Sequence, residues 1–252
     1  MRIEDLVILG RSSPDRMKDG RLSVCTAGYS PTHGFVRLYP TKMDSHLSAW
    51  SIVSVPVEKN PQDARRESWK IEGSRHEWDN LGDKIEVKGS VRRKDRLRFV
   101  SGHVSDCVFD IRDQRFSLGL VRPFEKQCYF EKRKDYDPDF QTTLFGGISS
   151  AGKRDYELRP RVRFRCSSCR AKDGHDQQIL EWGVYEWMRK NPGKEDQVWE
   201  NLFSHESSQE VLFLVGNQAT KPESFLVISI LRIPKTTRGP SPRSPSISSS
   251  KR

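Results

Sequence analysis

The sequence predicts a mainly β (α+β) protein built from two small β units, the second of which carries one or two helices. Short apolar runs bounded by turn-forming residues recur through the first sixty residues and again near the C-terminal end. Only residues 178–190 show a clear helical spacing of apolar side chains. Strand-rich sequence with short connections is typical of a small barrel or sandwich.

Composition limits the class of protein. A chain of 252 residues can bury the core of one large or two small domains without disulfides. The odd number of cysteines, five, and the lack of a cleavable apolar N-terminal segment predict a reducing, cytoplasmic compartment, where a close cysteine pair favours a metal. No apolar run approaches the ~20 residues that a membrane span needs, so we expect no membrane partner.

The net charge of +10 favours a polyanionic partner, although solubility alone is an equal explanation. Four of the positive charges lie in residues 236–252, which contain six serines and three prolines and no acid. Such a segment cannot bury a core, so we predict a disordered basic tail. The rest of the chain remains basic without it.

The first unit, residues 1–135, is predicted to hold strands at 6–9, 22–27, 35–39 and 52–57, with a charged insertion over about 58–95. In the third strand, alternation places Phe35, Arg37 and Tyr39 on one face. Two rings around a cation are typical of a single-strand nucleic-acid-binding surface. The alternative is that the rings pack against a neighbouring strand. Strand-like patterns resume at 97–100, 107–111 and 116–121.

A charge-rich segment at 125–138 is the predicted boundary between the two units, the second of which spans residues 136–235. The first strand of the second unit, 158–165, carries arginines on one face and contains Pro160, which predicts an edge strand or pairing that starts after it. Helices are expected at 178–190 and 195–203, and two late strands at 211–215 and 225–233. The arginines of the first strand are Arg159, Arg161, Arg163 and Arg165.

Guanidinium groups spaced along one strand repel each other unless anions compensate them. Arginine matches phosphate geometry, so a nucleic-acid backbone is one ligand for this face. Pairing with acidic residues on adjacent strands is the alternative, and the sequence gives the two equal weight.

A metal site is predicted where this strand ends. Cys166 and Cys169 form a C-x2-C knuckle, and His175 supplies a third ligand of the kind that zinc prefers. Spacing does not choose the fourth ligand, for which Cys107, Cys128, His103 and His205 are all candidates. Reduced cysteines packed as small apolar groups are the alternative to a metal. The motifs of zinc deaminases and zincins are absent from the sequence, which favours a structural zinc.

The motif from Leu22 to Pro40 resembles the opening of dual OB-containing domain proteins, a bacterial family. Its pattern is roughly C-x-A-G, a turn, then G-x-W-V-R. Here Cys25, Ala27, Gly28, Gly34, Val36 and Arg37 occupy matching positions, with Phe35 in place of the tryptophan. A later set of residues resembles a recurrent arrangement in uncharacterised bacterial proteins: the Cys166/Cys169 knuckle, Gly174-His175, Glu181-Trp182, Gly216-Asn217 and a final strand at 225–234. The resemblance implies two small OB-like barrels, a fold that binds single-stranded nucleic acid on an open strand face.

The leading hypothesis is therefore a nucleic-acid-binding module for single-stranded DNA or RNA, with a structural zinc and no catalytic residues. One alternative is a metal-dependent nuclease or other hydrolase, for which Glu86-Val87-Lys88 offers a weak E-x-K pattern. Another is a protein-interaction subunit of a prokaryotic defence or mobile-element complex, with Trp69 and Trp78 as exposed anchors.

Overall fold

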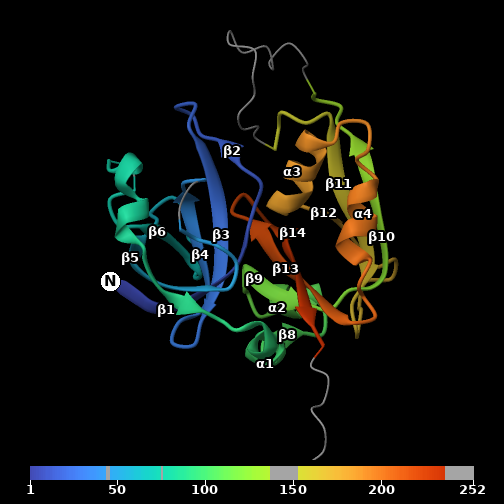
Figure 1. The fold of residues 1–252 in the computed structure, drawn as a ribbon, viewed down its shortest axis with the longest axis horizontal. Coiled ribbons are helices and arrows are strands. Elements are labelled where there is room, and N and C mark those ends of the chain that lie inside the picture. The colour runs from blue at the N-terminus through green and yellow to red at the C-terminus, as the bar shows by residue number, and fades with distance from the viewer. Residues whose placement is uncertain (44–45, 75, 137–152, 236–252) are drawn as a thin grey trace, which may run out of the picture.

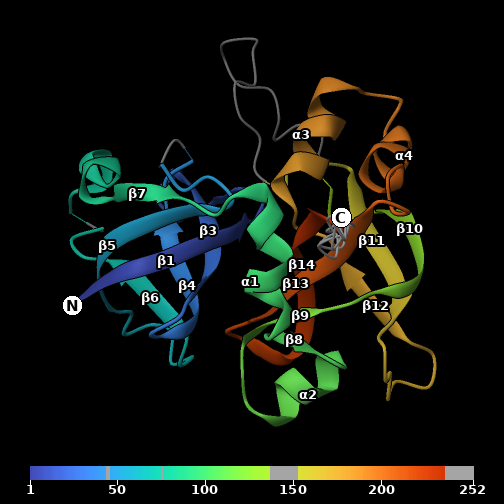
Figure 2. The same ribbon diagram turned by 60° about the horizontal axis from the view of Figure 1, so that its bottom comes forward.

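The computed structural model describes residues 1–43, 46–74, 76–136 and 153–235 of the chain. It has two β-rich halves packed against each other, with the longer helices on the outside of the second half (Figures 1 and 2). The predicted mainly β fold with few helices is confirmed. The predicted tail at 236–252 lies outside the described residues.

Five strands of the first half form a closed barrel. They follow one another in the order β1-β3-β4-β6-β5, and β5 pairs back onto β1. The β4–β6 pair is parallel, whereas the other four pairs are antiparallel. Closure leaves no free edge in the barrel wall. The strands are β1 (Arg2–Arg11), β3 (Leu22–Ser30), β4 (Gly34–Thr41), β5 (Ser51–Lys59) and β6 (Ser68–Ile71), with short flanking strands β2 (Asp15–Arg16) and β7 (Glu86–Ser90).

Alternation along the strands fills the barrel interior. Val36 and Leu38 of β4 are completely buried in its core, as the period of two predicts. Gly28 of β3 lies where β1 approaches closely, because a Cβ at this position would be 2.4 Å from the backbone oxygen of Val7. The glycine of the C-x-A-G motif is therefore required by strand packing.

The charged segment 58–95 is not only an insertion, because it supplies β6 and β7. Strand β6 is four residues long, too short for a clear alternation, yet it completes the barrel. The rest of this segment includes three 3-10 turns, η1 (Trp78–Asn80), η2 (Gly82–Lys84) and η3 (Arg93–Asp95).

Two predicted strands are wrong. The runs 97–100 and 107–111 belong to helices α1 (Arg96–Ser101) and α2 (Val108–Asp113). Val108 and Ile111, three residues apart, bury one face of α2. Apolar runs of four or five residues do not distinguish a strand from one or two helical turns, and tertiary packing decided the outcome.

The second half contains two sheets. The first has the order β10-β11-β12 and the second β14-β13-β9-β8. Within the described residues, the strand pairing between them is one parallel bridge, Ile179 with Val227, so this half is not clearly the second barrel that the resemblance implied. The strands are β8 (Val104–Ser105), β9 (Leu118–Val121), β10 (Phe124–Lys132), β11 (Leu158–Arg165), β12 (His175–Gln178), β13 (Gln209–Gln218) and β14 (Lys221–Pro234), with α3 (Trp182–Lys190) and α4 (Gln197–Phe203).

Strand β11 has the predicted bounds but is central in its sheet, with β10 on one side and β12 on the other. The edge position expected from Pro160 is wrong. The alternative, that pairing starts after Pro160, holds on the β12 side, where Arg161 is the first paired residue, but not on the β10 side, where Pro160 pairs with Phe130. The carbonyl of Pro160 accepts the N–H of Ile179 at 2.8 Å, just beyond the last β11–β12 pair, Arg161 with Gln178. The side of Pro160 that lacks a donor therefore faces the end of β12, where no ladder bond is lost.

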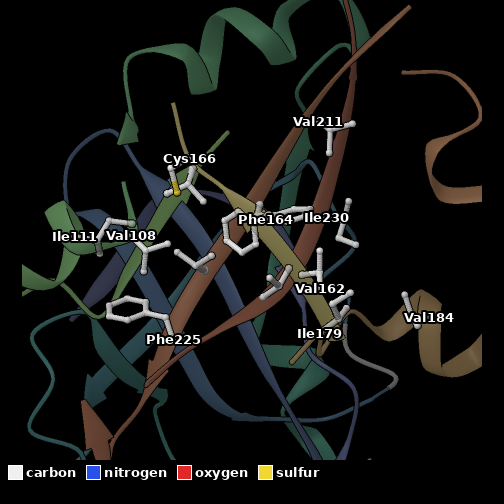
Figure 3. Packing of buried hydrophobic residues seen from close by; sticks show 14 of the residues in the cluster. Val108, Ile111, Val162, Phe164, Cys166, Ile179, Val184, Val211, Phe225 and Ile230 are labelled. Atoms are coloured by element: carbon white, nitrogen blue, oxygen red, sulfur yellow. The ribbon is translucent and has the colours of Figure 1, made fainter. Parts of the chain in front are cut away.

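The halves share a core. Val7 and Leu9 of β1 pack with Leu120 of β9 and Leu214 of β13, while Leu6 and Ile8 of β1 face the barrel interior. Burial on both faces explains the continuous apolar run at residues 6–9. A further cluster fills the second half, where Figure 3 shows side chains from α2, β11 and β14 side by side.

Candidate metal centre and the surroundings of the arginines

Four potential metal ligands meet at one end of β11. One ligand atom from each of Cys107, Cys166, Cys169 and His175 lies within 4.8 Å of the other three. Cys107 precedes α2, Cys166 and Cys169 follow β11, and His175 opens β12. The structure thus brings the three predicted ligands together and selects Cys107 from the four candidates for the last position.

The packing around His175 fixes its direction. Its Nε2 lies 3.5 Å from Sγ of Cys107 and 3.4 Å from Sγ of Cys169. The ring contacts those of Phe109 and Phe164, each with centroids 5.3 Å away. Gly174 has a φ of +75°, and a Cβ there would be 2.7 Å from the backbone oxygen of Phe164. Glycine therefore allows the chain to turn back so that His175 pairs with β11.

Burial shifts the pKa of two of the four side chains. It raises the pKa of the Cys166 thiol and lowers the pKa of His175, because both charged forms lose contact with water. The neutral imidazole is the form that binds a metal, and a bound cation favours thiolates over thiols. Three sulfurs and one imidazole nitrogen match the donor set of structural zinc sites, whose ligand atoms are about 3.8 Å apart in tetrahedral geometry.

The other candidate ligands have different surroundings. His103 stacks on Tyr29 with ring centroids 3.9 Å apart, and His205 is exposed in a loop. Cys128 lies on β10, where burial raises its pKa to about 12. Cys107 is 59 residues before Cys166 in sequence, so no spacing rule identified it.

The arginines of β11 alternate with buried Pro160, Val162 and Phe164, as predicted. Acidic residues of β10 and β12, and of the segment after β10, compensate their charges. Arg159 pairs with Glu131 at 3.6 Å and with Asp135 at 3.7 Å, and Arg165 pairs with Glu125 at 3.3 Å.

The carboxylate of Asp176 lies between the two central arginines of this face. Asp176 pairs with Arg161 at 2.9 Å and with Arg163 at 3.2 Å. Tyr129 donates to the same carboxylate at 2.8 Å, and the guanidinium of Arg163 lies over its ring. Partial burial raises the pKa of Asp176, but the bonds from Tyr129 and the two arginines outweigh it and hold the pKa below its usual range.

The predicted nucleic-acid-binding residues of β4, Phe35, Arg37 and Tyr39, have a different environment. Arg37 is only 5% exposed, and its Nη2 donates to the backbone oxygen of Ser117 in the second half at 2.8 Å. Phe35 and Tyr39, on either side, are half-buried. The predicted stacking of Arg37 on bases at an open face is therefore not available to this side chain.

Two cavities lie along the outer face of β4, one on each side of Arg37. The larger, about 750 Å³, is lined by Phe35, by rings of both halves, and by Lys59 and Arg66 of the first half. The smaller, about 420 Å³, is lined by Arg37 itself and by Tyr39. Neither was visible to sequence reasoning, because each needs residues from both halves.

Other sequence signals have ordinary structural explanations. Glu86 pairs with Lys88 at 2.6 Å and, in the part of the chain that the structure describes, belongs to no group of three or more potential metal ligands. The expected exposure of Trp78 is wrong, since it is 8% exposed beneath Arg21. The described helices include none with the length and apolar character to cross a membrane.

Comparison with protein families divides the chain into two adjacent parts. Residues 2–100 match the model described as Domain of unknown function (DUF8758), and residues 108–249 match the model described as Domain of unknown function (DUF8757). The second match covers more than half of the chain. The protein therefore belongs to the DUF8757 family. The two matches agree with a two-domain organisation. Strands β8, β9 and β10 pair with one another or with β11 and β13, so they belong to the sheets of the second half. No curated protein matches the chain.

Proposed function

We propose that this protein is a single-stranded nucleic-acid-binding module whose second half is braced by a structural zinc ion. The observation that carries the proposal is the cavity of about 750 Å³ on the outer face of β3 and β4, where aromatic and cationic side chains gather. Single-strand binders combine such rings, on which bases stack, with cations that follow the backbone.

The barrel supports this assignment. In sequence order the five barrel strands are β1, β3, β4, β5 and β6, and the one parallel pair joins the third, β4, to the fifth, β6. This arrangement is that of an OB barrel. OB folds bind oligonucleotides on the face of their second and third strands. Here these strands are β3 and β4, which contribute Tyr29 and Phe35 to the cavity. The two rings touch edge to face with centroids 5.2 Å apart.

The remaining lining extends this surface. Trp69 of β6 presents its ring with Lys59 Nζ 3.5 Å from the ring centroid, and Arg66 lies over Phe116 of the second half. The one carboxylate of the lining, Glu67, accepts from the N–H and hydroxyl of Ser117 and is thereby satisfied. A stacked base contributes about 1–3 kcal/mol.

The arginine face of β11 is proposed as a second, weaker phosphate-binding surface. Arg163 and Arg165 keep 61% and 45% of their side chains exposed, whereas Arg159 and Arg161 are more enclosed. Because each is paired with an acid, a phosphate must compete with a carboxylate already in place.

Zinc is proposed for the Cys107, Cys166, Cys169 and His175 cluster. Four protein ligands complete a tetrahedral site and leave no position for substrate or water, which favours a structural over a catalytic role. Elemental analysis of protein purified without added metal is expected to give one zinc per chain. A metal-free protein with an unchanged melting temperature would contradict the assignment.

The nucleic-acid proposal is tested by titrating fluorescent oligothymidylate and oligouridylate at several salt concentrations. We expect binding that weakens with salt and that falls about tenfold in Phe35→Leu, which keeps apolar volume but removes the stacking ring. A variant with glutamine at all four β11 arginines measures the second surface separately. Absence of binding at low salt, or binding unaffected by both variants, would overturn the proposal.

A further inference from the structure

The smaller cavity beside Arg37 is a second candidate site, distinct from the aromatic cavity. We propose that it binds a phosphate monoester, with Arg37 as the charge that selects it. The cavity of about 420 Å³ lies between β3 and β4 of the barrel and the β13–β14 turn of the second half. Its volume is in the range of small-ligand sites, and no motif in the sequence indicated it.

Arg37 is a buried cation without a carboxylate partner. Its guanidinium donates to Ser117 at the backbone oxygen, 2.8 Å away, and weakly to Sγ of Cys25 at 3.9 Å. Its Nε is buried and has no hydrogen-bond partner. Among the residues that the structure describes, no ion pair includes Arg37, and burial lowers its pKa.

The backbone is arranged to admit this side chain. Gly216 of β13 lies against it, and a Cβ there would be 3.0 Å from Nη2 of Arg37 and 2.5 Å from Cδ1 of Ile228. Burying a charge without a counter-ion costs several kcal/mol, and apolar residues of similar volume would fill the same space without that cost. An anion in the adjoining cavity would compensate the charge.

The other ionic groups of the cavity already have partners of opposite charge. Lys153 pairs with Asp15 at 2.8 Å, and both line the cavity. Arg65 is bound to Asp63 at 2.6 Å, which lies outside the lining. Three cations and one carboxylate therefore face the space, and the cation of Arg37 is the one left without an acid.

Neutral donors complete the recognition surface. The hydroxyl groups of Tyr39 and Ser23 line the same cavity as the cations. A phosphate monoester presents several acceptor oxygens and at least one full negative charge, so it can accept from more than one of these donors at once. A neutral ligand would leave the charge of Arg37 uncompensated.

This inference does not depend on nucleic-acid binding in the aromatic cavity. Phe35 lines only the larger cavity and Arg37 only the smaller, so one site can fail while the other holds. The phosphate group can come from a free mononucleotide or from the phosphorylated end of a nucleic-acid strand, and the experiment separates these sources.

Isothermal titration of the full chain with inorganic phosphate, AMP, and oligothymidylate carrying a 5′-phosphate or a 5′-hydroxyl tests the proposal. We expect inorganic phosphate and AMP to occupy one site, with an affinity at least about tenfold lower in Arg37→Gln. The 5′-hydroxyl strand measures binding at the aromatic cavity alone. Arg189→Gln, on α3 and already paired with Glu186 at 2.9 Å, is the matched control and should bind like the wild type. Preference for AMP over the 5′-phosphorylated strand identifies a free nucleotide, and the reverse identifies a strand end.

A second variant guards against misfolding of Arg37→Gln. Thr220 lines the cavity from the exposed β13–β14 turn, so Thr220→Glu adds a competing carboxylate without disturbing the core. It should weaken phosphate binding about tenfold and leave the melting temperature unchanged. No binding of any phosphate ligand by the wild type, or equal binding by wild type and Thr220→Glu, would overturn the proposal. Phe35→Leu should leave phosphate affinity unchanged.

Discussion

The arginines of β11 and Arg37 of β4 occupy the same kind of position but have opposite surroundings. All alternate with buried apolar residues on a strand. The β11 set is partly exposed and every member has an acidic partner, whereas Arg37 is 5% exposed and has none among the described residues. Neighbouring strands, rather than the strand that carries an arginine, therefore decide whether its charge is available to a ligand.

The largest effect should come from the cluster that holds the end of β11 against β12. Cys166→Ser is expected to abolish zinc binding and to lower the unfolding free energy by about 3 kcal/mol or more, because folding and metal binding are coupled. Zinc content and urea denaturation measure this. Cys128→Ser, in the same half but outside the cluster, is the control and should keep one zinc per chain. Retained zinc in Cys166→Ser would contradict the assignment.

Acid should weaken the contact beside the Arg37 cavity. Hydrogen bonds from Arg65 and Ser68 outweigh partial burial and lower the pKa of Asp63 from 3.8 to about 2. A lowered pKa contributes stability that is present above pH 3.8 and is lost as the pH falls towards 2.

After allowance for solvent screening, this contribution is about 1 kcal/mol. Urea midpoints between pH 4 and pH 2 should therefore fall less steeply in Asp63→Asn than in the wild type. Parallel pH profiles for the two proteins would show that the Arg65–Asp63 pair contributes no pH-dependent stability.

Replacement of Arg37 by an apolar side chain tests whether its buried charge binds phosphate. In phosphate-free buffer, Arg37→Met should unfold within about 1 kcal/mol of the wild type, because relief of desolvation offsets the lost hydrogen bonds. The backbone oxygen of Ser117 keeps a partner, the N–H of Asn217 at 3.1 Å. Phosphate at about 100 times its dissociation constant should stabilise the wild type by about 2.7 kcal/mol and leave Arg37→Met unchanged. Equal stabilisation of both proteins would place the anion elsewhere.

The smallest effect is expected on the β11 face. Glu131 contacts Arg159 at 3.6 Å and Arg161 at 3.7 Å, and it is about half exposed. Glu131→Gln should change stability by less than about 0.5 kcal/mol, because exposed pairs contribute little. It should also strengthen binding of single-stranded oligonucleotides at low salt, because one carboxylate that competes with phosphate is removed while Asp135 and Asp176 remain. Unchanged binding would show that this face does not contact nucleic acid.

Local sequence patterns predicted the parts of the fold that depend on neighbouring residues. The bounds of β11 and the inward direction of Val36 and Leu38 follow from a period of two. Helix α3 begins at Trp182 rather than Gln178, because residues 175–178 pair with β11 before the helix starts. The short strand β6 and helices α1 and α2 were missed, since a few apolar residues fit either period.

The alternating arginines, the C-x2-C knuckle and His175 can be recognised from spacing within about ten residues, so they follow from the chain alone. The tertiary contacts are needed for the closing of the barrel by β6, for the approach of Cys107 to the other three potential ligands, and for the pairing of arginines with acids. These depend on which distant segments become neighbours. Burial distinguishes Arg37 from the arginines of β11. A charge removed from water needs a partner of opposite charge, whereas a charge at the surface does not.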